Sequence, residues 1–182
     1  ANSDEQQNYC ESGDGHSVEP FPYSDLSMIP DLYEPYVKYT LIMIKNIKSP
    51  NIPDYIFANM CISQLFLTDD QITTITNNSF AGIAYLQILR LERNKIKSLS
   101  GLINSIQIDT LERLYLQNNQ IERVEFKFSL KFVNLNRLDL TNNFIEVISD
   151  SVFENLVNLE ELLIISNHLK SIGNFTFYNL QI

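Results

Sequence analysis

The stretch that decides the fold is Leu86-Gln87-Ile88-Leu89-Arg90-Leu91-Glu92-Arg93-Asn94. Its pattern, L-x-x-L-x-(L/I)-x-x-N, returns at residues 111–119, 135–143 and 159–167. Residues 62–70 carry the same unit with Asp70 in the asparagine place, and residues 39–47 are a degenerate copy. Successive starts are separated by 23, 24, 25, 24 and 24 residues, and a fixed period of this length indicates a repeat architecture.

This pattern is typical of leucine-rich repeats. Apolar side chains at the first, fourth and sixth places can form one face of a short strand, and stacked neighbours turn that face into a continuous core. We therefore predict an α/β repeat fold, a horseshoe-shaped solenoid with a parallel β-sheet on its concave face and an irregular or 3-10 convex side. The six predicted repeats are residues 39–61, 62–85, 86–110, 111–134, 135–158 and 159–182.

The asparagine that ends each unit has both a donor and an acceptor, so it can satisfy backbone groups where the chain leaves the strand. We expect a buried structural ladder of Asn94, Asn119, Asn143 and Asn167. On the convex side a phenylalanine recurs at Phe57, Phe80, Phe153 and Phe177. The two middle repeats lack it, so their convex side should be irregular.

Charge is unevenly distributed along the chain. The net charge is -9, and eight acidic residues precede the first basic residue, Lys38. Residues 1–38 also hold four prolines and show no periodicity, which predicts an acidic, Pro- and Tyr-containing N-terminal flank or cap before the solenoid of residues 39–182. An acidic chain is not expected to coat nucleic acid, and no apolar run approaches the ~18–20 residues of a membrane span.

Two kinds of feature point to an extracellular protein. Asn77-Asn78-Ser79 and Asn174-Phe175-Thr176 are glycosylation acceptor sequences at the same phase of the repeat, although both asparagines could be ordinary polar turn residues. Cys10 and Cys61 are the only cysteines. A bridge between them would tie the flank over the open edge of the solenoid; two free thiols or an intermolecular bridge are the alternatives.

The outward-facing strand residues form the concave surface, the usual binding face of a solenoid. Four of the five arginines fall there, near aromatic side chains, which is the composition of an interaction hot spot. Our candidate partner-binding residues are Phe66, Arg90, Arg93, Arg113, Tyr115, Arg137 and Asp139. The alternative is a solvated face on which Glu92, Asp139 and Glu161 pair with the arginines.

Leu163 and Ile165 face outward in the last repeat, which predicts a possible homo-oligomer through the C-terminal end. We find no nucleophile elbow, no phosphate-binding glycine loop and no cysteine with a nearby histidine. Two histidines far apart in the chain do not suit a zinc site. We therefore expect no catalytic residue, no metal and no cofactor.

The 24-residue unit of residues 135–158 resembles the extracellular typical class of leucine-rich repeats found in Toll-type and Slit-type proteins. A closer likeness is to insect secreted leucine-rich repeat immune proteins. It rests on the start Gln6-Gln7-Asn8-Tyr9-Cys10 and on the motif at residues 51–57. The resemblance implies binding of partner proteins in the haemolymph, including complement-like factors.

We therefore predict a secreted protein-binding module, acting in innate immunity or extracellular recognition, that binds a protein partner on its concave face. The alternatives are a non-catalytic scaffold subunit of a secreted enzyme complex and an intracellular leucine-rich repeat adaptor.

Overall fold

The computed structural model describes Cys10, Leu26, residues 38–44, Ile47 and residues 49–180. Apart from Cys10, Leu26 and Lys38, the predicted acidic flank lies outside the described residues.

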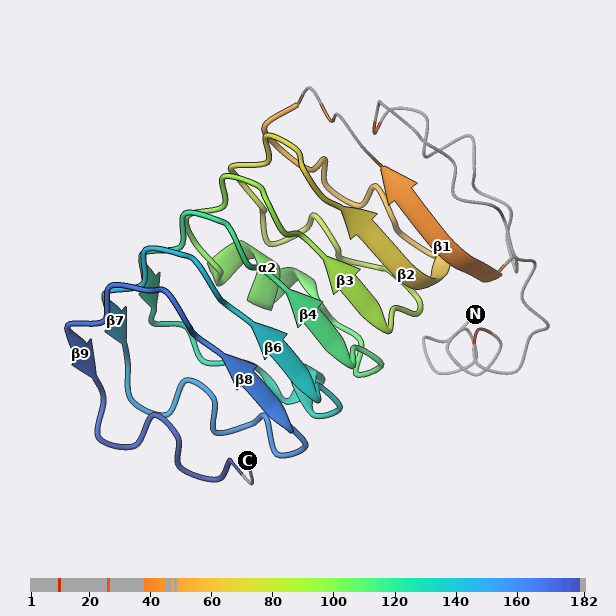
Figure 1. Ribbon diagram of the computed structural model, residues 1–182. Helices are drawn as coiled ribbons and strands as arrows, with labels where there is room; N and C mark the ends of the chain where they lie inside the picture. The colour runs from red at the N-terminus through yellow and green to blue at the C-terminus, as the bar shows by residue number, and fades with distance from the viewer. Residues whose placement is uncertain (1–9, 11–25, 27–37, 45–46, 48, 181–182) are drawn as a thin grey trace.

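The main sheet takes one strand from each repeat, all parallel and in chain order (Figure 1). Its strands are β1 (Lys38–Ile44), β2 (Cys61–Leu67), β3 (Ile88–Arg90), β4 (Arg113–Tyr115), β6 (Arg137–Asp139) and β8 (Glu161–Leu163). Leu65, Leu89, Leu114 and Leu138, at the fourth place, face one another in register and are fully buried. The predicted leucine-rich repeat solenoid is therefore confirmed, with one repeat in each turn of the coil.

The asparagine column forms a ladder beside the sheet. Asn119 shows the pattern: its Oδ1 accepts a hydrogen bond from the Ile96 amide of the preceding repeat at 3.0 Å. Its Nδ2 donates to the carbonyls of Leu91 at 2.9 Å and Leu116 at 3.0 Å, and so joins two neighbouring repeats. Equivalent bonds are made by Asn94, Asn143 and Asn167, and Asp70 Oδ1 accepts from the Ile47 amide.

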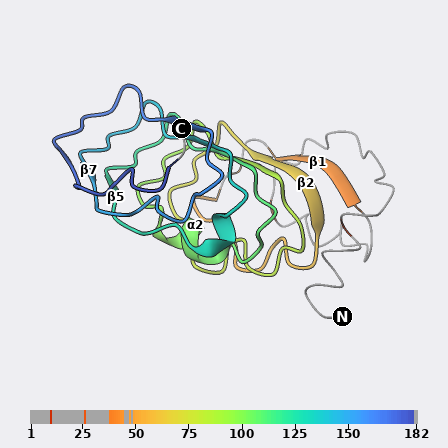
Figure 2. The same ribbon diagram turned by 90° about the horizontal axis from the view of Figure 1, so that it is seen from below.

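After the ladder the chain turns into a second, three-stranded parallel sheet and then returns along the convex side. The second sheet consists of β5 (Arg123–Val124), β7 (Val147–Ile148) and β9 (Ser171–Ile172). The return carries the helix α2 (Ser100–Ser105) and the 3-10 turn η2 (Leu130–Phe132). Figure 2, seen from below, places α2 on the side of the coil opposite the main sheet.

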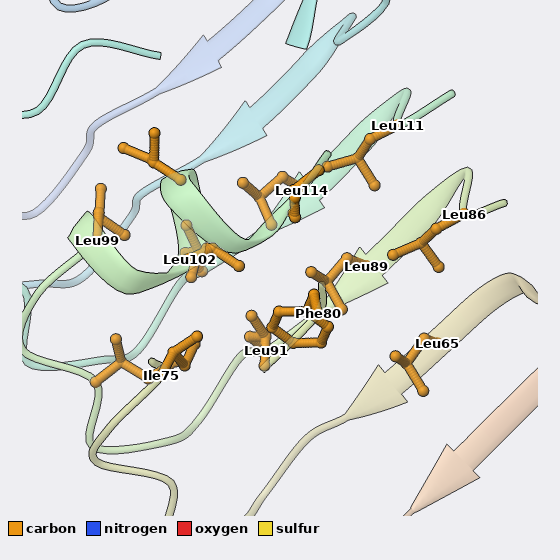
Figure 3. Packing of buried hydrophobic residues seen from close by; sticks show 14 of the residues in the cluster. Leu65, Ile75, Phe80, Leu86, Leu89, Leu91, Leu99, Leu102, Leu111 and Leu114 are labelled. Atoms are coloured by element: carbon orange, nitrogen blue, oxygen red, sulfur yellow. The ribbon is translucent and has the colours of Figure 1, made fainter. Parts of the chain in front are cut away.

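The prediction of an irregular convex side is wrong for the repeat of residues 86–110, which forms α2. In place of the missing phenylalanine, Leu102 and Ile103 fill the core (Figure 3 shows Leu102). The helix lies very close to the preceding repeat at Gly101. A Cβ added there would stand 1.7 Å from the Ile75 carbonyl oxygen, so this position requires glycine. The helix, packed closely through Gly101, thus takes the place of the phenylalanine packing seen elsewhere. An example of that packing is the Phe57–Phe80 stack, with ring centroids 5.7 Å apart.

A disulfide joins Cys10 to Cys61 at the start of β2, with the two Cα atoms 5.5 Å apart. Cys10 is fully buried and packs with Tyr85, while Leu26 is buried in the main core. The flank is therefore attached to the first turns of the solenoid at two points, one covalent and one apolar.

Candidate binding surface on the concave face

Aromatic and arginine side chains alternate across four strands of the concave face. The Arg90 guanidinium lies between two rings, 5.0 Å from the Phe66 centroid and 4.6 Å from that of Tyr115. The Arg137 guanidinium lies 5.5 Å from the same Tyr115 ring. We call Phe66, Arg90, Tyr115 and Arg137 the concave stack. Cation–π contacts of this kind hold the long arginine side chains in place and present flat surfaces to a partner.

The acids that could neutralise these arginines do so only in part. Arg90 forms an ion pair at 3.0 Å with Glu92, which lies two residues later in the same repeat. Arg137 pairs with Glu161 on the neighbouring strand. Asp139 instead accepts a hydrogen bond from the Thr141 amide at 2.9 Å and so stabilises the turn that follows β6. Of the alternative pairings across strands, the described residues show one, between Arg137 and Glu161; Glu92 is buried and pairs within its own repeat.

The other two candidate arginines have different surroundings. Arg93 lies in the turn after β3 and donates from Nη2 to Asp69 at 2.7 Å. That hydrogen bond, with the charge of Asp69, raises the pKa of Arg93 above its ordinary value. Arg113 is exposed and has no ion-pair partner among the described residues. Arg113 is thus the cation of this face whose charge is not neutralised within the described chain.

A hollow of about 490 Å³ adjoins this arginine, lined by Arg113, Tyr115, Asn136, Arg137, Glu160 and Glu161. Sequence reasoning did not select Asn136 and Glu160, because both precede their strands and lie outside the outward-facing columns. Asn136 directly precedes the candidate Arg137, and that position is the signal that could have found it; Glu160 precedes Glu161, which was not a candidate binding residue.

Four buried polar atoms of this face lack a hydrogen-bond partner within the described chain. They are Arg90 Nε, Glu92 Oε2, Gln117 Oε1 and Arg137 Nε. Buried polar atoms are normally satisfied, and their concentration on three adjacent repeats marks this region as different from the rest of the fold. Glu92 and Gln117 were not among the predicted site residues, because the repeat pattern places the seventh position in an outward-facing column and does not indicate buried polar atoms there.

The two glycosylation sequences occupy equivalent places on the convex return. Asn77 and Asn174 are exposed, but Ser79 and Thr176 are buried. Ser79 Oγ donates to the Ile52 carbonyl at 3.0 Å, and Thr176 Oγ1 donates to the Ser149 carbonyl at 3.1 Å. Each hydroxyl therefore ties its repeat to the preceding one, which by itself explains why the two sequences share a phase.

Apolar residues of the last repeat are more exposed to solvent than their counterparts in the preceding repeat. Leu163 in β8 is half-buried, and Ile165 is 64% exposed. Core-type residues of this repeat, including Leu169 and Ile172, are also exposed, whereas their counterparts Ile145 and Ile148 one repeat earlier are buried.

A second hollow, of about 420 Å³, follows the ladder edge and is lined mainly by amide side chains with Phe144 and His168. Within the ranges that the structure covers, no cluster of three acidic, histidine or cysteine side chains suits a metal ion. In the same ranges no helix has the length and apolar character of a membrane span.

The comparisons with known proteins agree with this geometry. A leucine-rich repeat family model matches residues 109–169 and 133–182, and no curated protein sequence matches the chain. The complex of TLR13 with ssRNA13 contains a chain that is 22% identical with a TM-score of 0.58, over 86% of this chain and 25% of that one. The octameric complex of latrophilin 3, Unc5D and FLRT2 contains one at 22% identity and a TM-score of 0.63, over 94% of this chain and 56% of that one.

The chain therefore spans about a quarter and about half of the two solved chains it resembles. At this identity the likeness shows the fold alone. The sequence period, the family model matched over residues 109–182 and the parallel solenoid together show the leucine-rich repeat fold.

Proposed function

We propose that the protein is an extracellular recognition module that binds a protein partner on its concave face without catalysis. The concave stack is the observation that carries this proposal. Tyrosine, phenylalanine and arginine dominate interface hot spots because they bury a large area at little cost in conformational entropy. Here the sheet holds them in a fixed row, so little ordering remains to be done on binding.

Support for an extracellular location comes from chemistry. A disulfide persists in oxidising compartments, and Cys10–Cys61 spans 51 residues. Exposed Asn77 and Asn174 are accessible acceptors for glycan. A role in innate immunity rests on the resemblance to insect secreted repeat proteins. The related solved structures add only that such folds occur in complexes with proteins, in the FLRT2 assembly, and with RNA, in the TLR13 complex.

Site-specific photo-crosslinking tests the binding face. A benzophenone side chain at Ile88, a half-exposed position of β3 beside Arg113, should crosslink to a protein in the extracellular fluid of the source. The matched control is the same group at Lys131, exposed in η2 on the convex side, which should capture nothing. Crosslinks from Lys131 alone would contradict the proposal. A catalytic chain captured through Ile88 would favour the scaffold alternative.

The glycosylation proposal can be separated from the structural role of the same sequence. Asn77→Gln should remove a glycan from the secreted protein and leave the free energy of unfolding of the unglycosylated protein unchanged. Ser79→Ala should remove the glycan and also destabilise the unglycosylated protein by about 1–3 kcal/mol, because the Ile52 carbonyl loses its donor. Denaturant unfolding and intact mass measure both effects; a full-length secreted chain without glycan at either site contradicts glycosylation.

We also propose that the apolar residues Leu163 and Ile165 of the last described repeat mediate self-association. Sedimentation should show concentration-dependent association, and Ile165→Asp should abolish it by placing a charge in the apolar contact. Val157→Asp, at an exposed apolar residue outside the sheet, is the control and should leave association intact. A monomer at every concentration would contradict this proposal.

A further inference from the structure

Two arginines face each other directly on neighbouring strands. Arg113 of β4 and Arg137 of β6 are register partners in the parallel sheet. Neighbouring strands lie about 4.8 Å apart, and like charges placed directly opposite each other destabilise a sheet. A cation pair in this position is unfavourable for the isolated fold, so an anion between the two side chains would stabilise it.

The chain compensates only one of the pair. Arg137 is held by Glu161 and by the Tyr115 ring, although its Nε is buried and has no partner in the described chain. Arg113 has neither a carboxylate nor a ring partner among the described residues. Arg113 lines the hollow of about 490 Å³, which is large enough for an amino-acid side chain.

We infer that this hollow binds a side-chain carboxylate, from an aspartate or glutamate in an exposed segment of the partner protein. The inference rests on the proposed function and specifies the chemistry of its central contact. A planar guanidinium offers paired donors that match the two oxygens of a carboxylate. Arg113 supplies the free fork, Arg137 supplies a second positive charge across the strand, and the Asn136 amide adds a neutral polar group.

The acids of the hollow determine which carboxylates fit. Glu161 already forms an ion pair with Arg137, so it competes with the incoming carboxylate for that guanidinium. Glu160 also lines the hollow and adds a second negative charge. With two negative charges balancing two positive ones, a run of acidic residues would be repelled, and a single carboxylate directed at Arg113 is favoured.

The test uses peptides selected by display on the full 182-residue chain. Selected peptides that compete with one another should share one acidic residue, and replacing it by its amide should weaken binding about tenfold or more, the effect of losing a charge-assisted hydrogen bond. Arg113→Ala should produce a similar loss and Arg113→Lys a smaller one. Arg123→Ala is the matched control, since Arg123 is exposed outside the main sheet and paired with Glu125, and it should change nothing.

One variant should gain affinity. Glu161→Gln releases Arg137 and should tighten binding of the acidic peptide severalfold, a result that loss of folding cannot produce. Equal binding of the acidic peptide and its amide twin, or of wild type and Arg113→Ala, overturns the inference. If amidating the peptide C-terminus abolishes binding, the carboxylate is terminal and the side-chain assignment is wrong.

The proposed function can survive that failure. Peptides without an essential acid that still crosslink through Ile88 would leave the concave face as the binding surface and remove only its carboxylate site. A selection that yields no peptides competing for one site on the concave face also counts against the carboxylate site.

Discussion

The structure depends on the hydrogen bonds of one side chain repeated along the coil. Each ladder asparagine accepts from the amide of the preceding repeat and donates to carbonyls on both sides, as Asn119 does with Ile96, Leu91 and Leu116. These backbone groups are buried where the chain leaves the sheet, and no regular secondary structure could satisfy them there. The ladder therefore ties each repeat to the one before it and so sets the register of the strands.

Because the strands pair in register, corresponding side chains stand side by side across the concave face. Register places Arg90 beside Tyr115 and Arg113 beside Arg137. The first pairing contributes to the concave stack. The second places two cations side by side, of which Arg137 pairs with Glu161 on the next strand. Both features of the candidate site thus follow from the register of the repeats.

The sequence predicts what the repeat period controls: the strands, their order, the ladder positions and the columns of outward residues. It does not predict what side-chain torsion and local packing decide. Asp139 lies in an outward column but serves the Thr141 amide, and Arg93 turns to Asp69. The burial of Glu92 is decided by side-chain packing, and the helix at Gly101 depends on its close approach to Ile75 of the preceding repeat. The equal phase of the two glycosylation sequences has a structural cause in the buried hydroxyls of Ser79 and Thr176.

The most direct test of the ladder's role is amide hydrogen exchange combined with denaturant unfolding of Asn119→Ala. We predict that the Ile96 amide loses protection, that exchange rises in both adjoining repeats, and that unfolding becomes easier by at least about 2 kcal/mol, since several buried groups lose their partners. Asn118→Gly, at an exposed neighbour with φ of 59°, should leave both quantities nearly unchanged. Unaltered protection at Ile96 and unaltered stability in Asn119→Ala would contradict the claim that the ladder sets the register of the fold.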